Sequence, residues 1–236
     1  MFEIRRSQQR GQGRHGWLNS QHSFSFAGYM DPERMGFSVL RVINDDEVAP
    51  GTGFATHTHR DMEIISIILQ GTIEHKDSMG HVLQLQAGDV QRMSAGTGIT
   101  HSEYNVSSDE ILRLLQIWIE PNQLGVTPGY EQLAWIDRKE GKEGDKKLSV
   151  LVSADRRDGS MFLHQDAVLS VGCLVNDELL ALSLNMARRY YLHMMTGEIT
   201  AADQTLTEGD ALTIENENSL QLQAKGGARF LLFDLP

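Results

Sequence analysis

Apolar residues in this chain occur in short alternating or continuous runs, broken by glycine, aspartate and asparagine. Short runs of this kind, rich in β-branched residues, are typical of β-strands rather than helices. Strands are predicted at 64–69, 72–75, 81–85 and 113–119, and Asp77-Ser78-Met79-Gly80 is a predicted hairpin turn. The pattern, together with 22 glycines, predicts an all-β fold with frequent turns.

A weak internal repeat divides the chain. The segment 69–73 followed by Gly88-Asp89 has a shorter counterpart in 195–199 followed by Gly209-Asp210. Two related β-barrels, the second trimmed, are the simplest explanation. We predict an N-terminal domain at 1–137 and a C-terminal domain at 138–236. The charged stretch 138–147 is the candidate linker, with a solvated loop inside one domain as the alternative.

Side chains that bind metals alternate at two places in the first half. His57 and His59 are separated by one residue, and so are His101 and Glu103. Because side chains on a strand alternate between its faces, each pair lies on one face. On neighbouring strands the two pairs would bring three imidazoles and a carboxylate together, a set that suits a divalent transition metal. The second half contains neither pattern, so the metal site is predicted in the first barrel.

Other candidates have weaker support. Asp61, two residues after His59, offers an alternative carboxylate, as in iron sites built from two histidines and one carboxylate. The remaining histidines have no partner at ligand spacing and are predicted to be surface or structural residues, although His22 could reach the barrel mouth; they are His15, His22, His75, His81, His164 and His193. Four apolar residues near the ligands could line a pocket for a flat aromatic substrate or simply pack in the core: Phe37, Phe54, Met62 and Met93.

Composition excludes several classes of protein. The formal net charge of -11 disfavours direct binding to nucleic acid, which needs a basic surface. The single cysteine, Cys173, cannot form a disulfide within the chain and is predicted to be a small buried residue rather than a catalytic thiol. The N-terminus has no apolar signal segment, and no run approaches the roughly 18 apolar residues of a membrane span. We therefore expect a cytoplasmic protein without membrane contact.

The spacing of glycines and histidines resembles the cupin superfamily. Gly51, His57, His59 and Gly71 follow its first motif, and Gly88, Gly98, His101 and Asn105 follow its second. Glu63 lies one residue too early for the carboxylate usual in the first motif, and Glu103 supplies a carboxylate instead. That arrangement is similar to the pirin family. Further pirin-like stretches are 16–18, 22–26, 35–37, 40–44, 59–63 and 93–99, thinning in the second half to 157–160 and 164–166.

The resemblance implies a fold, a metal and an activity. The fold would be a bicupin with two jelly-roll-like barrels, the second degenerate. The metal would be held by His57, His59, His101 and Glu103. Iron(II) is the expected ion, with Cu, Ni, Co, Mn or Zn as alternatives. The activity would be opening of the heterocyclic ring of a flavonol such as quercetin by O2 with release of carbon monoxide, with Glu103 as the base.

Two alternatives stay open at this point. One is a regulatory protein that binds a protein partner according to the metal's redox state, as in pirins similar to transcriptional co-regulators. The other is a cupin isomerase or thiol dioxygenase that acts on a different substrate.

Overall fold

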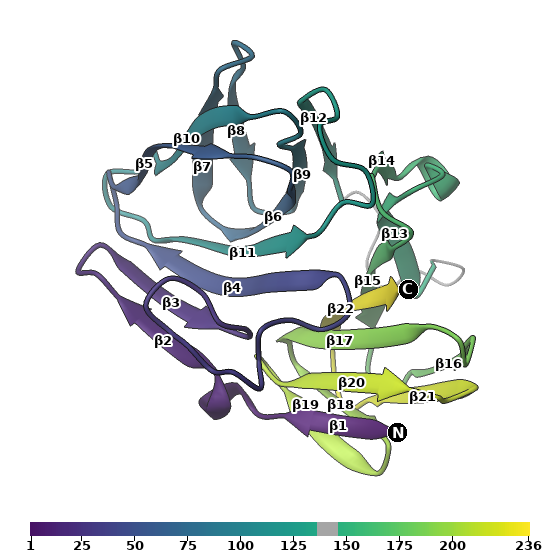
Figure 1. Ribbon diagram of the computed structural model, residues 1–236. Coiled ribbons are helices and arrows are strands. Elements are labelled where there is room, and N and C mark those ends of the chain that lie inside the picture. Colours follow the sequence, from purple (N-terminus) through teal and green to yellow (C-terminus); the bar gives the residue numbers. More distant parts are fainter. Residues whose placement is uncertain (136–145) are drawn as a thin grey trace. The chain divides into compact units, whose positions relative to one another are not determined.

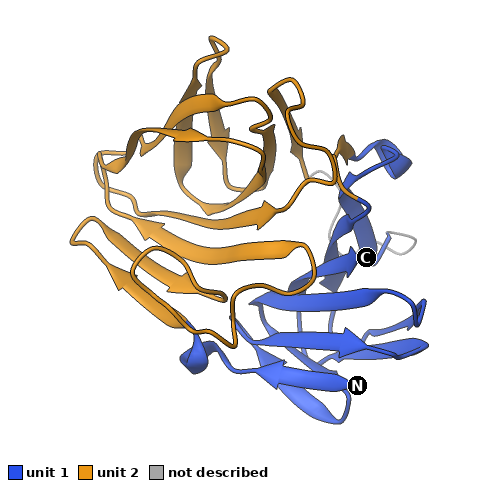
Figure 2. Ribbon diagram, viewed as in Figure 1, with its two compact units in different colours: residues 1–10, 136–160, 166–236 blue, residues 11–135, 161–165 orange. Residues whose placement is uncertain are grey.

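The computed structural model describes residues 1–135 and 146–236. In these two ranges the helices are two short 3-10 turns, η1 (Ser7–Gln9) and η2 (Arg157–Gly159), so the all-β prediction is confirmed. Neither turn is long and apolar enough to cross a membrane, and the same holds for every helix in the part described. The chain forms two compact units (Figure 2). We call Gly11–Trp135 with Met161–Gln165 the N-terminal unit, and the other described residues the C-terminal unit.

The N-terminal unit consists of two antiparallel sheets (Figure 1). The larger sheet has the order β12 (Gly129–Ala134), β9 (Asp89–Ser94), β6 (Glu63–Gln70), β11 (Leu112–Ile119), β4 (Leu40–Val48), β3 (Leu18–His22) and β2 (Gly11–Arg14). The smaller sheet has the order β5 (Gly53–His59), β10 (Ile99–Asn105), β7 (Thr72–Asp77) and β8 (Val82–Gln86). The short strand β14 (Met161–Phe162) also belongs to this unit.

Local sequence explains the turns of the N-terminal unit. β6 is an almost continuous apolar run because both of its faces are buried. Gly71 ends it with φ +78°, and a Cβ there would meet the carbonyl oxygen of Ile111 at 3.0 Å, so this position favours glycine. In the turn between β7 and β8, the Asp77 carboxylate accepts the backbone N–H groups of Met79 at 2.9 Å and His81 at 3.1 Å. The predicted hairpin is therefore confirmed.

The C-terminal unit repeats this arrangement of strands. Its larger sheet runs β1 (Phe2–Arg5), β20 (Ala211–Glu215), β17 (Arg189–Thr196), β22 (Ala228–Leu235), β15 (Val168–Leu174) and β13 (Leu148–Ser153). Its smaller sheet runs β16 (Leu179–Ser183), β21 (Ser219–Ala224), β18 (Glu198–Ala201) and β19 (Gln204–Thr207). The order of strands across the sheets is the same in both units. The order β16-β21-β18-β19 corresponds to β5-β10-β7-β8, and the order β20-β17-β22-β15 corresponds to β9-β6-β11-β4. The internal repeat is thus a repeat of topology.

The interiors of the two units differ. In the C-terminal unit, Leu182 pairs with Leu220 and Leu180 with Leu222, on the strands that correspond to β5 and β10. These leucines pack with Leu192, Leu212, Phe230 and other apolar residues in one continuous cluster. The second barrel is therefore filled with hydrocarbon, which explains why it has no ligand pattern.

Two short segments group with the unit that is more distant in sequence. Met1–Arg10, inside the predicted first domain, belongs to the C-terminal unit because β1 pairs with β20. Met161–Gln165 belongs to the N-terminal unit, where the Gln165 amide donates to the Glu120 carbonyl at 2.7 Å. The predicted boundary after residue 137 and most of the predicted linker 138–147 lie outside the described residues.

Candidate metal centre

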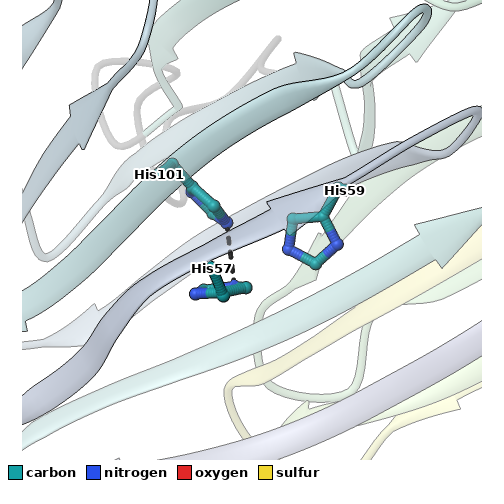
Figure 3. A group of neighbouring side chains, drawn as sticks. All are labelled: His57, His59 and His101. Carbon is teal, nitrogen blue, oxygen red and sulfur yellow. Dashed lines mark hydrogen bonds between the residues drawn. The ribbon is translucent and has the colours of Figure 1, made fainter.

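Three histidines converge where β5 pairs with β10. His57 lies directly opposite His101 in the register of the two strands, and His59 lies opposite Ile99. The Nε2 atoms of His57 and His101 are 3.1 Å apart, and the ring of His59 lies 4.7 Å and 4.9 Å from those of His57 and His101. Figure 3 shows His101 pointing from its strand towards His57, with His59 beside them. One ligand nitrogen from each ring lies within 4.8 Å of the other two.

Two of these imidazoles, those of His59 and His101, are held in their neutral form. Burial lowers the pKa of His101 to about 3, and the neighbouring His57 and His59 act in the same direction. Burial and the proximity of His57 lower the pKa of His59 to about 4. A neutral imidazole has a free lone pair, which is the form that binds a metal ion. The cluster therefore offers nitrogen ligands at neutral pH.

Glu103 follows His101 on the same face of β10 and is fully buried. Its carboxylate accepts hydrogen bonds from the amides of Gln91 at 2.6 Å and Gln116 at 3.1 Å, and from the Ser66 hydroxyl at 3.4 Å. Burial raises its pKa to about 7 although these donors stabilise the charged form. All three donors are uncharged, so none of them neutralises the Glu103 carboxylate when it is ionised.

The donors to Glu103 come from adjacent strands of the larger sheet. Gln116 on β11 pairs with Ser66 on β6, and Ser66 pairs with Gln91 on β9. The Tyr130 hydroxyl on β12 donates to the Gln91 side-chain carbonyl at 3.1 Å, which orients the Gln91 amide nitrogen towards Glu103. This row of residues in register was not predicted from the sequence, because isolated Gln and Ser residues show no pattern until their strands are aligned.

A third strand, β7, contributes to the same face. Its His75 lies opposite Glu103 and its Asp77 lies opposite His101. His75 is completely buried, its ring lies 5.3 Å from that of His101, and its Nε2 is 3.3 Å from the Asp77 carboxylate. The same carboxylate is 2.8 Å from His81 Nδ1. His75 does have the hydrogen-bonded role predicted for it, but it also lies beside the candidate ligands.

Among the described residues, two groups of ligand-type atoms result, and they share His101. One consists of His57, His59 and His101, and the other of His75, His101 and Glu103. The structure therefore brings the predicted histidines together, and it places Glu103 beside His101 in a second, wholly buried group. A signal for the second group was present in the sequence, since His75 and Asp77 alternate just as His57 and His59 do.

The other carboxylates of the first half lie elsewhere. Asp61 has φ 48°, and its carboxylate accepts the Gly125 N–H at 2.7 Å. Neither group of ligand-type atoms found in the described ranges includes it. Glu63 is buried beside His164 at 3.1 Å and accepts the Ser94 hydroxyl at 3.0 Å. The geometry thus gives no support to Asp61 as a ligand.

A cavity of about 360 Å³ lies in the N-terminal unit. Its lining includes the aromatic rings of Trp17, Phe26 and Phe54 and the polar side chains of His22, Asp46 and Gln116. His22 does reach this cavity, and its Nδ1 bonds to Asn44 Oδ1 at 2.8 Å. Because Gln116 also donates to Glu103, one wall of the cavity reaches the candidate metal centre.

The predicted pocket residues fall into two classes. Phe54 lines the cavity, where its ring meets Trp17 edge-on at 5.1 Å. Met93 is buried in an apolar cluster with Ile64, and Met62 packs against that cluster, while Phe37 forms a bridge with Leu40. Cys173 is only partly buried, and burial raises its thiol pKa, which argues against a reactive thiolate.

Known proteins similar to this chain cover it from end to end. The family model described as Pirin matches residues 3–119, and the one described as Quercetinase C-terminal cupin domain matches residues 150–235. A protein of Escherichia coli (strain K12) named quercetin 2,3-dioxygenase is 47% identical over 236 residues, which is 100% of this chain and 99% of that protein. A pirin-like protein of Caulobacter vibrioides is 39% identical over 93% of each chain.

A solved structure supports the same relationship. The crystal structure of the bacterial pirin YhhW from Escherichia coli, in complex with nickel(II), superposes with a TM-score of 0.94 and 45% identity. The superposition covers 100% of this chain and 99% of that one.

Proposed function

This chain belongs to the pirin family, and from that premise we propose that it is a metal-dependent dioxygenase acting on flavonols such as quercetin. The reaction opens the heterocyclic ring with O2 and releases carbon monoxide. The observation that carries the proposal is the convergence of three imidazoles beside the buried carboxylate of Glu103, next to a cavity lined by aromatic side chains. A relative named quercetin 2,3-dioxygenase and sharing 47% of its residues supports the choice of substrate.

We propose His57, His59, His101 and Glu103 as the metal ligands. The hydrogen-bonding of His57 fits this role, since its Nδ1 lies 2.8 Å from the Ala55 carbonyl oxygen and donates to it. That bond leaves the lone pair on Nε2, which faces the Nε2 of His101 at 3.1 Å. A cation bound there would satisfy both nitrogens.

We propose iron(II) as the native ion. Imidazole nitrogens also bind Cu, Ni, Co, Mn and Zn, and the order of affinities favours copper, so metal supply decides which ion is loaded. The nickel(II) complex of a similar bacterial pirin supports a divalent transition metal. When bound, such an ion would supply Lewis acidity that makes a ligated hydroxyl group a stronger acid.

The chain's own residues prepare the substrate for reaction with O2. Glu103 takes the proton of the flavonol 3-hydroxyl group, since its carboxylate is acceptor-only when ionised and its donors carry no charge. Gln91 and Gln116 orient that carboxylate from the opposite sheet. The rings of Trp17, Phe26 and Phe54 offer a flat apolar surface and exclude water.

The test is anaerobic loading with iron(II), followed by addition of O2 and quercetin. We expect metal-dependent loss of quercetin absorbance with carbon monoxide formed in step. The His101→Ala variant removes a proposed ligand and should lose this turnover. The matched control is His164→Ala, because His164 belongs to neither ligand group of the described residues and should leave turnover intact. A metal-loaded protein without turnover would contradict the proposal and favour the regulatory alternative.

A further inference from the structure

Asp46 is a buried carboxylate of the N-terminal unit that the proposed metal centre does not use. Asp46 lies on β4, is 2% exposed, and lines the cavity together with Trp17, Phe26 and Phe54. Its Oδ1 accepts no hydrogen bond from any residue that the structure describes. The Ser20 hydroxyl hydrogen-bonds to the carboxyl group, but Ser20 alone does not satisfy both oxygens.

An unpaired carboxylate in such a place is costly. Buried polar groups in proteins are nearly always hydrogen-bonded, and leaving one unpaired costs more than the bond itself contributes. Burial raises the pKa of Asp46 to about 7, and the nearby carboxylates of Asp45 and Glu103 add to the effect. Unpaired buried groups of this kind are found at functional sites, because a bound ligand can supply the missing hydrogen-bond partner.

The neighbouring residue shows what an ordinary carboxylate looks like on this strand. Asp45 forms a salt bridge with Arg113, with distances of 3.1 Å to Nε and 3.0 Å to Nη2. Successive residues of a strand point to opposite faces, so Asp45 and Asp46 point away from each other. Asp45 does not line the cavity, whereas Asp46 does.

The cavity has the size and the walls of a site for an aromatic molecule. Its volume of about 360 Å³ falls in the range of small-molecule pockets, roughly 300–1,000 Å³. The aromatic rings of Trp17, Phe26 and Phe54 line it, and Gln116, which also lines it, donates a hydrogen bond to Glu103. A flat molecule in this cavity therefore lies against both Asp46 and Gln116, the side chain that donates to Glu103.

We propose that Asp46 is a specificity-determining residue, which accepts a hydrogen bond from a phenolic hydroxyl group of the substrate remote from the metal. This inference rests on the proposed function, because it takes the substrate to be a polyhydroxylated flavonol. A flat polyphenol carries hydroxyl groups as its hydrogen-bond donors. Such a donor suits the Asp46 carboxylate, which is an acceptor surrounded by aromatic rings. Asp46 thus selects hydroxylated flavonols over flavonols without further hydroxyl groups.

The test compares two ligands at equilibrium, without oxygen and therefore without turnover. Quercetin carries hydroxyl groups on both outer rings, and 3-hydroxyflavone carries only the group proposed to reach the metal. Dissociation constants would be measured for metal-loaded wild type, Asp46→Leu and Asp46→Asn, with Asp45→Asn as the matched control. Asp46→Asn keeps the shape of the side chain, so its dissociation constants test the inference even if Asp46→Leu does not fold.

At a pH above 7, where Asp46 is ionised, we expect Asp46→Leu to weaken quercetin binding about tenfold or more, as for loss of a hydrogen bond to a charged group, with 3-hydroxyflavone unaffected. Asp46→Asn should reduce the preference for quercetin partly, and Asp45→Asn should not change it. An equal effect on both ligands, or no effect, would overturn the inference. Turnover with an unchanged preference would leave the proposed function standing, whereas a lost preference without any turnover would support Asp46 and contradict the dioxygenase.

Discussion

Glu103 is held in the barrel interior by two amides and a hydroxyl group, each from a different strand. A salt bridge would keep such a carboxylate ionised and reduce its basicity. The neutral donors instead fix its position while burial raises its pKa to about 7. A carboxylate with those properties is a suitable proton acceptor near neutral pH.

Replacing Glu103 with Gln should lower kcat by about a hundredfold or more while quercetin binding changes little, because an amide cannot take the proton. The measurement is kcat per bound metal ion, beside the anaerobic dissociation constant for quercetin. Normalising to bound metal separates the loss of the base from loss of a ligand. Equal kcat values for the variant and the wild type would exclude Glu103 as the base.

The raised pKa of Asp46 leads us to expect that the free energy of unfolding depends on pH. Its pKa is raised from 3.8 to about 7, mainly by burial, so the folded protein binds this proton more tightly than the unfolded chain. Stability should therefore fall as pH rises from about 4 to about 7, by about 4 kcal/mol at most for this group. Asp46→Asn should remove this fall. The variant should therefore exceed the wild type in stability by the largest amount above pH 7, and the difference should vanish towards pH 4.

Urea unfolding of the wild type and Asp46→Asn across this pH range checks the prediction. Asp45→Asn is the matched control, because Asp45 is paired with Arg113. Parallel pH profiles for the wild type and Asp46→Asn would show that Asp46 ionises normally in the folded protein.

At the scale of elements, β10 is the strand on which the candidate site depends. It pairs with β5 on one side and β7 on the other, so side chains from all three strands share its inner face. The alternation of His57 with His59 and of His101 with Glu103 was enough to predict the histidine cluster. Residues two apart lie on the same face of any β-strand, so this spacing predicts which side chains share a face before the strand pairing is known.

The rest of the site depends on which strands become neighbours, which spacing along one strand does not reveal. His75 is close in sequence to the predicted hairpin turn, and only the pairing of β7 with β10 places it beside Glu103. Likewise, Met93 is near the ligands in sequence but belongs to an apolar cluster with Ile64. Asp46 carried no signal in the sequence, because its importance comes from the partner its carboxylate lacks.

Gly53 sets the close approach of β5 to β10. A Cβ at this position would lie 2.2 Å from the Glu103 carbonyl oxygen and 2.6 Å from the Tyr104 Cα. Both atoms are backbone, so Gly53→Ala must push the strands apart, at a cost of about 1–3 kcal/mol. Metal affinity should fall about tenfold or more with that displacement, because ligand geometry is lost.

Chelator competition and thermal unfolding would measure the two effects. Gly28→Ala is the control, since nothing lies within 4 Å of a Cβ built there. A Gly53→Ala variant with the affinity of the wild type would show that β5 tolerates the shift without moving His57 and His59.

The whole molecule contains one strand order twice, with opposite interiors. The N-terminal unit has histidines, amides and carboxylates inside its barrel, and the C-terminal unit has Leu180, Leu182, Leu220 and Leu222 on the corresponding strands. Buried polar groups are costly even when they are paired, whereas buried leucines contribute stability directly. The apolar barrel therefore contributes stability directly, and the polar barrel holds the candidate metal centre.

Truncating a leucine of the C-terminal unit should reduce stability without removing the metal. Leu222 is completely buried, so Leu222→Ala should cost about 2–5 kcal/mol. Leu179→Ala, at a position 51% exposed, should cost far less. Urea unfolding gives the cost, and metal analysis of the folded protein should still find one ion per chain. Loss of the ion from folded Leu222→Ala would contradict this separation.

Two barrels with one strand order are the expected product of duplication within a gene. The second copy has kept the turns that close its hairpins, including Gly197 with φ +77° where the first copy has Gly71 with φ +78°. What it lacks is the inward-facing histidines of the candidate metal centre, because leucines occupy the corresponding strands. Backbone geometry is thus common to both copies, whereas the candidate metal centre lies in one of them, so these two features of the pattern can vary separately.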